Sequence, residues 1–81
     1  MVVKVVFYSY FKDLTGCAQT TETLPAGSTV GELVASLSAR FPKLGAMRKS
    51  MLVAVNVDYQ ASNAILKEGD EVSLFPPVQG G

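Results

Sequence analysis

The sequence predicts one α+β domain, in which a mixed sheet of four or five strands carries one main helix on one face. Three observations predict it. The chain has 81 residues, a length that suits a single domain. Runs of β-branched and aromatic residues near both ends are typical of strands. Between them, one apolar stripe at helical spacing indicates a single main helix.

Residues 2–11 are β-branched and aromatic and predict the first strand. Side chains along this strand alternate between two faces. Because Lys4 is charged, the face that carries Lys4 and Tyr8 is expected to meet solvent. Residues 12–16 predict a turn. Residues 18–24 are polar on both faces, which favours a short edge strand in a hairpin with the first. The core face is expected to carry Val3, Val5, Phe7, Ser9 and Phe11.

A helix is predicted over residues 29–41. Thr29 and Glu32 have the spacing of a capping box, in which each side chain bonds the other residue's backbone N–H. Pro42 is expected to end the helix at about Phe41. The apolar stripe consists of Val30, Leu33, Val34, Leu37 and Phe41.

The second half of the chain predicts two further strands, at 51–56 and 71–75, and a very short one near Tyr59. Residues 66–70 indicate a turn in which Gly69 supplies a positive φ. In the last strand, alternation turns Val72 and Leu74 toward the core and Phe75 to the opposite face. We therefore expect a domain over residues 1–75 and an extended tail over residues 76–81.

Composition excludes several classes of function. Basic and acidic residues number seven each, so the strongly basic footprint of a nucleic-acid-binding protein is absent. One cysteine and no histidine argue against disulfides, a metal site and histidine acid–base catalysis. No apolar run approaches the ~18 residues of a membrane span, and no signal-peptide cleavage pattern is present. We expect a cytoplasmic protein without nucleic-acid or membrane partners.

Charged residues are unevenly distributed. Residues 40–49 contain four basic and no acidic residues, whereas residues 58–81 contain four acidic residues and one basic. The asymmetry is compatible with steering of a partner, but ordinary loop solvation is the favoured explanation.

The last residues suggest chemistry. Gly80 and Gly81 bring no side chains, so such an end can thread a narrow channel. Its terminal carboxylate is ionised at neutral pH and can attack an activated phosphorus. Pro76 and Pro77 stiffen the chain after Phe75 into an extended path. Together these features indicate an acyl carrier whose reactive atom is its own terminus.

The tail FPPVQGG resembles the FPPVxGG end of the MoaD family, the small subunit of molybdopterin synthase. The segments VKVVFYSYFKDLTG, TVGEL, AVN and L-x-x-GDEV resemble the same family in the expected order and cover nearly the whole chain. The resemblance implies a ubiquitin-like β-grasp fold and the function of a sulfur carrier.

In that family, an E1-like activating enzyme of the MoeB type adenylates the terminal glycine with ATP. A sulfur donor then converts the adenylate to a thiocarboxylate. A large subunit of the MoaE type receives the tail and passes the sulfur to cyclic pyranopterin monophosphate. The resemblance thus implies no stably bound cofactor in this chain, since ATP acts in trans.

Residue by residue, the resemblance implies that Gly81 bears the thiocarboxylate. Gly80 threads the channel, and Gln79 occupies a variable position in the tail. The partner-binding positions are Tyr8, Phe75, Pro76, Pro77 and Val78.

Three alternatives remain open from the sequence. A sulfur carrier of the ThiS type, which serves thiazole synthesis, shares the Gly-Gly end but usually lacks Phe-Pro-Pro before it. A ubiquitin-like modifier would instead join Gly81 to lysines of other proteins. In a plain interaction module, the two glycines would be incidental.

Overall fold

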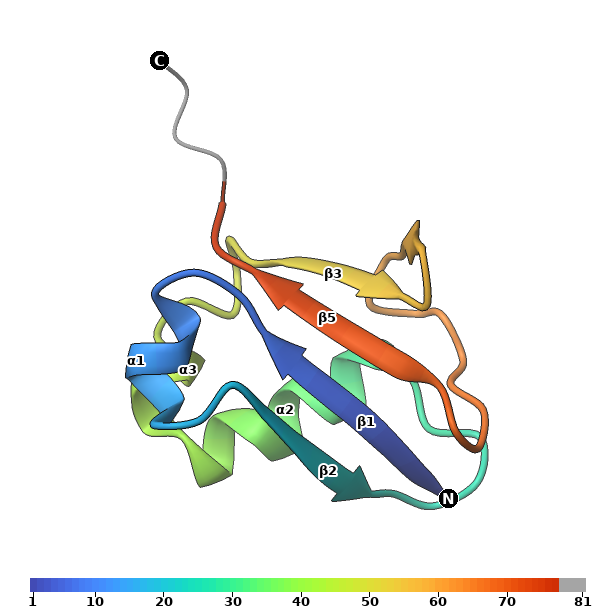
Figure 1. Ribbon diagram of the computed structural model, residues 1–81. Helices are drawn as coiled ribbons and strands as arrows, with labels where there is room; N and C mark the ends of the chain where they lie inside the picture. The colour runs from blue at the N-terminus through green and yellow to red at the C-terminus, as the bar shows by residue number, and fades with distance from the viewer. Residues whose placement is uncertain (78–81) are drawn as a thin grey trace.

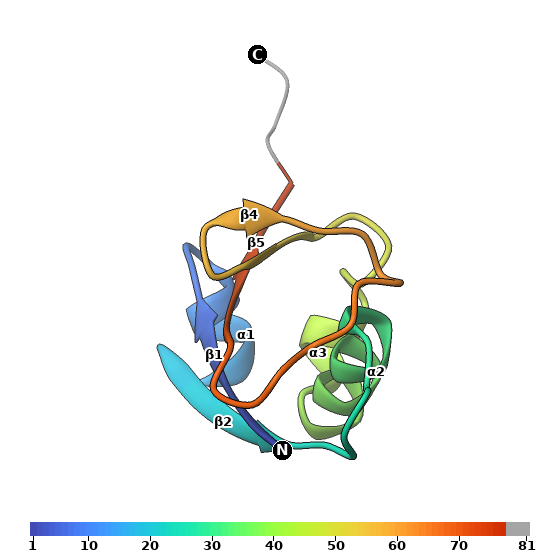
Figure 2. The same cartoon turned by 90° about the vertical axis from the view of Figure 1, so that its right-hand side faces the viewer.

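The computed structural model describes residues 1–77, which form a five-stranded sheet with one main helix across one face (Figures 1 and 2). The strand order is β2-β1-β5-β3-β4. β1 and β5 run parallel in the sheet, and the other neighbouring strands are antiparallel. This confirms the predicted α+β architecture. The strands are β1 Val2–Phe7, β2 Gln19–Thr23, β3 Leu52–Val55, β4 Asp58–Tyr59 and β5 Glu71–Phe75.

The main helix, α2 (Val30–Arg40), begins at the predicted capping box. The backbone N–H of Glu32 donates to Thr29 Oγ1 over 3.2 Å, and the N–H of Thr29 donates to Glu32 Oε1 over 3.0 Å. The helix ends at Phe41, as expected. A short helix, α3 (Pro42–Gly45), follows directly and was not predicted. Proline ends one helix and is tolerated in the first turn of the next, where its missing N–H costs nothing.

The core lies between α2 and the sheet. Every α2 residue and strand residue expected to pack there, apart from Ser9 and Phe41, is buried. Ser9 is exposed and Phe41 is half-buried against the core. The buried apolar cluster contains Val3, Val5, Phe7, Phe11, Leu24, Val30, Leu33, Val34, Leu37, Leu44, Val53, Leu66, Val72 and Leu74.

The predicted first strand is too long. β1 ends at Phe7, and Ser9 adopts a left-handed conformation with φ of 56°. The chain then forms a short helix, α1 (Phe11–Thr15), where a turn was expected. Gly16, with φ of 77°, ends α1 by donating its N–H to the carbonyl of Lys12. Phe11 is buried as predicted, but from a helix and not from a strand.

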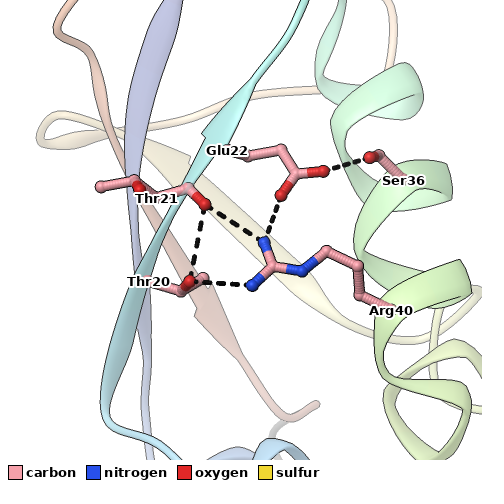
Figure 3. A network of polar contacts seen from close by, with 5 residues as sticks. All are labelled: Thr20, Thr21, Glu22, Ser36 and Arg40. Atoms are coloured by element: carbon pink, nitrogen blue, oxygen red, sulfur yellow. Dashed lines mark hydrogen bonds and ion pairs between the residues drawn. The ribbon is translucent and has the colours of Figure 1, made fainter.

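A polar cluster joins the edge strand β2 to α2 (Figure 3). Glu22 lies on the core-facing side of β2 and is only 8% exposed. Its carboxylate accepts from Ser36 Oγ and pairs with the Arg40 guanidinium. Arg40 also donates to the carbonyl of Thr21 and to Thr20 Oγ1, each over 3.1 Å. The sequence had suggested polar residues on both faces of this strand, without a buried carboxylate.

Of the tail expected over residues 76–81, Pro76 and Pro77 are described and follow β5 outside any helix or strand. The rest of that prediction lies outside the described residues. Within residues 1–77, no helix has the length and apolar character needed to cross a membrane.

Candidate functional site

The candidate site forms where the chain leaves the sheet. Because β1 and β5 are parallel neighbours, their carboxyl ends reach the same end of the sheet (Figure 1). Tyr8 follows β1 and donates its N–H to the carbonyl of Leu74 over 3.1 Å. The rings of Tyr8 and Phe75 stack, with 4.6 Å between centroids and 15° between planes. Two predicted partner-binding residues, 67 positions apart in sequence, are thus in contact.

A third aromatic ring comes from the sheet edge. Tyr59, in β4, lies 6.2 Å from Phe75 between ring centroids and is 69% exposed. Leu52 pairs with Phe75 across β3 and β5 and is also exposed. Neither residue was predicted from the sequence as part of the site. Tyr59 belongs to this face because it pairs with Ala54, and a two-residue strand carries too little alternation to predict that.

These side chains border a groove of about 360 Å³. We call it the aromatic groove. Its walls are apolar and aromatic, and the left-handed turn at Ser9 presents a tyrosine on either side. Exposed aromatic surface of this kind is typical of protein interfaces, where such residues contribute much of the binding energy. The groove is lined by Tyr8, Ser9, Tyr10, Leu52, Tyr59, Phe75, Pro76 and Pro77.

The structure therefore brings together four predicted site residues, Tyr8, Phe75, Pro76 and Pro77. The other four, Val78, Gln79, Gly80 and Gly81, lie outside the described residues. Across residues 1–77, no group of three metal-ligating side chains comes together. The described part of the site is an exposed aromatic groove that adjoins the start of the tail.

A mixed sheet ordered 2-1-5-3-4 under one main helix defines a ubiquitin-like β-grasp domain, and the aromatic groove lies where the chain leaves its sheet. The chain belongs to the ThiS family, whose model matches residues 5–81.

Relatives agree with this assignment. The chain is 33% identical to the molybdopterin synthase sulfur carrier subunit of Arabidopsis thaliana, covering 98% of this chain and 82% of the relative. It is 31% identical to the protein of the same name from Chlamydomonas reinhardtii, and that match covers 100% of both chains. The resemblance read from the sequence motifs is confirmed.

Solved structures confirm the β-grasp fold. A putative molybdopterin converting factor subunit 1 from Pyrococcus furiosus superimposes with a TM-score of 0.88 at 30% identity, covering 96% of this chain and 99% of that one. A chain from the complex of subunits 1 and 2 of the Helicobacter pylori molybdopterin-converting factor gives 0.72 at 27% identity, with 100% of both chains covered.

Proposed function

We propose that this protein is the sulfur carrier subunit of a molybdopterin synthase and that the carboxyl group of Gly81 carries the sulfur. The observation that carries the proposal is the FPPVQGG segment, whose first three residues line the aromatic groove. The family match extends through this segment to residue 81. The names of the relatives support molybdopterin, and not thiazole, as the destination of the sulfur.

The proposed chemistry has two steps. The Gly81 carboxylate attacks the α-phosphorus of ATP in an E1-like enzyme, which forms an acyl adenylate and releases pyrophosphate. A sulfide equivalent from the sulfur donor then attacks the acyl carbon, AMP leaves, and a thiocarboxylate remains. ATP acts in the enzyme's site, so the carrier needs no resident cofactor. We place both steps in the cytoplasm, as expected from the sequence.

The carrier then delivers its sulfur to cyclic pyranopterin monophosphate in a large subunit. The aromatic groove is the proposed docking surface, because Phe75, Pro76 and Pro77 lead from it into the tail. The Helicobacter pylori relative was solved in complex with subunit 2 of its converting factor. A large subunit seated on the groove would hold the stiff diproline segment and aim the glycines into its own active site.

Variants that lengthen or shorten the tail test the proposal. One residue added after Gly81 moves the reactive carbonyl by about 3.5 Å, and a misplacement of ~1 Å can cost about a hundredfold in rate. We expect this extension, and deletion of Gly81, to abolish ATP–pyrophosphate exchange with the cognate activating enzyme and molybdopterin formation with the large subunit. Thermal stability should not change, because the buried apolar cluster is formed by residues between Val3 and Leu74.

Gly80→Val is a companion variant of unchanged length. Its branched side chain restricts the backbone and obstructs a narrow channel, so we expect loss of both activities. Gln79→Ala is the matched control, since that position tolerates variation in the resembling family. Wild-type activity from a chain extended past Gly81 would contradict the carrier function. Protein conjugates of higher mass on an immunoblot would favour a modifier instead.

A further inference from the structure

A second groove, of about 430 Å³, lies between α2 and the β3–β4 edge of the sheet. We call it the basic-rimmed groove. The elements that bound it, α2 and β4, face the viewer in Figure 2. Its floor is formed by the flank of the core, where Val30, Val34 and Val53 are almost completely buried and Met51 is half-buried. Arg48 and Lys49 form its rim.

The rim is positively charged and has no counterion within the described part of the chain. Arg48 and Lys49 are exposed, and within residues 1–77 neither forms an ion pair or a side-chain hydrogen bond. None of the described residues that line the groove is acidic. Arg40, another cation of the 40–49 segment, is already paired with Glu22. Two free cations above an apolar floor complement a segment that carries carboxylates beside an apolar side chain.

The two grooves adjoin the same edge of the sheet. Leu52 and Tyr59 line both of them, so they meet at the β3–β4 edge. The far end of the basic-rimmed groove is closed at the first turn of α2. There the N–H of Gly31 donates to the carbonyl of Ser62 over 2.8 Å, and even a Cβ at Gly31 would lie 3.2 Å from that oxygen. A partner that occupied both grooves would therefore cross the β3–β4 edge at Leu52 and Tyr59.

We propose that the basic-rimmed groove is a second docking site for the large subunit, which places there an acidic segment bearing one apolar side chain. The inference rests on the proposed function, because the partner is the same protein. Contact at Arg48 and Lys49 would steer the encounter and orient the partner across the β3–β4 edge. The aromatic groove would then hold the complex while the tail enters the active site.

Charge reversal tests the rim. The association rate of the cognate large subunit is measured by stopped flow at low and high salt, with wild type and with the double variant Arg48→Glu/Lys49→Glu. We expect the double variant to associate about tenfold more slowly at low salt, and the difference to shrink at high salt, where surface charges are screened. Both side chains are exposed, so the thermal melt should be unchanged.

The matched control compares one substitution at two exposed lysines. Lys49→Glu changes the rim, whereas Lys67→Glu makes the same change at a residue that lines neither groove. We expect only Lys49→Glu to slow association. A further variant, Ala61→Trp, fills the groove without altering its charge and should speed dissociation of the complex.

The outcomes separate this inference from the function on which it rests. If Phe75→Ala weakens the complex while Lys49→Glu behaves like Lys67→Glu, the second docking site is overturned and the proposed function stands. If wild type forms no complex with its large subunit, both fall. The docking site is supported if the rim variants associate more slowly in a salt-sensitive way and Lys67→Glu does not.

Discussion

Phe75 connects the fold to the proposed function at the scale of a single residue. It ends β5, and alternation turns its ring away from Leu74, which is completely buried. The ring is half-buried because it stacks on Tyr8 on the outer face of the sheet. Phe75 therefore contributes little to the core and remains available to a partner, next to Pro76 and the tail.

Truncation of this ring should affect assembly more than folding. We expect Phe75→Ala to weaken binding of the large subunit by more than ~1 kcal/mol, because central aromatic residues dominate interface energetics. Isothermal titration calorimetry measures the affinity, and a circular-dichroism melt checks the fold. Val57→Ala, which truncates an 89%-exposed apolar residue outside both grooves, is the control. An unfolded Phe75→Ala would mean that the ring belongs to the core.

The sequence allowed part of this site to be predicted. Tyr8 and Phe75 lie in long strand-like runs, so alternation alone places both on the outer face. Tyr59 and Leu52 could not be found in the same way. Their membership depends on the register of β3 against its two neighbours, and register is a property of the assembled sheet.

At the scale of elements, the edge strand β2 is held by side chains as well as by its pairing with β1. Glu22 reaches Ser36 and Arg40 of α2 from the core-facing side of the strand. The side chain of Glu22 is only 10% exposed, so its charge depends on these partners. The cluster joins the edge of the sheet to the helix above it.

Removal of the Glu22 carboxylate should therefore destabilise the fold. We expect Glu22→Ala to lower the free energy of unfolding by ~1–3 kcal/mol, because Arg40 and Ser36 lose a partly buried acceptor. Urea denaturation followed by circular dichroism measures the change. Glu71→Ala is the matched control, since Glu71 pairs with Lys4 at 3.7 Å with both side chains about half exposed. Such surface pairs contribute about 0–1 kcal/mol. Equal losses in the two variants would contradict the bracing role of Glu22.

Helix α2 contributes to the stability of the fold mainly through its buried apolar stripe. Leu33 is completely buried, and we expect Leu33→Ala to cost ~2–5 kcal/mol through lost contacts and the cavity left behind. Ile65→Ala, at a site 65% exposed, should change stability by no more than about 0.5 kcal/mol. Thermal melts of both variants test this assignment, and an unchanged melt for Leu33→Ala would refute it.

The errors in the predicted elements have local causes. The capping box and the apolar stripe define α2 strongly, and the structure reproduces both. The strand predicted over residues 2–11 ends instead at Phe7. The left-handed conformation of Ser9 could not be predicted, because no glycine marks the position. α1 and α3 have only five and four residues, too few to show helical periodicity. Neither short helix changes the fold class.

At the scale of the whole molecule, one topological feature organises the proposed site. The parallel pairing of β1 with β5 brings the turn after the first strand beside the start of the tail. The core packs against one face of this sheet, and the opposite face presents the aromatic groove. Parallel pairing joins segments distant in sequence, so alternation predicts the faces of β1 and β5 but not that the two strands are neighbours.

The intact mass of the protein shows whether Gly81 carries sulfur. The chain is incubated with its cognate activating enzyme, ATP and a sulfur source, and its mass is compared with that of a sample lacking ATP. We expect an increase equal to the difference between one sulfur and one oxygen atom, and no increase for a chain extended past Gly81. An unchanged mass in the complete reaction, or an increase in the extended chain, would contradict it.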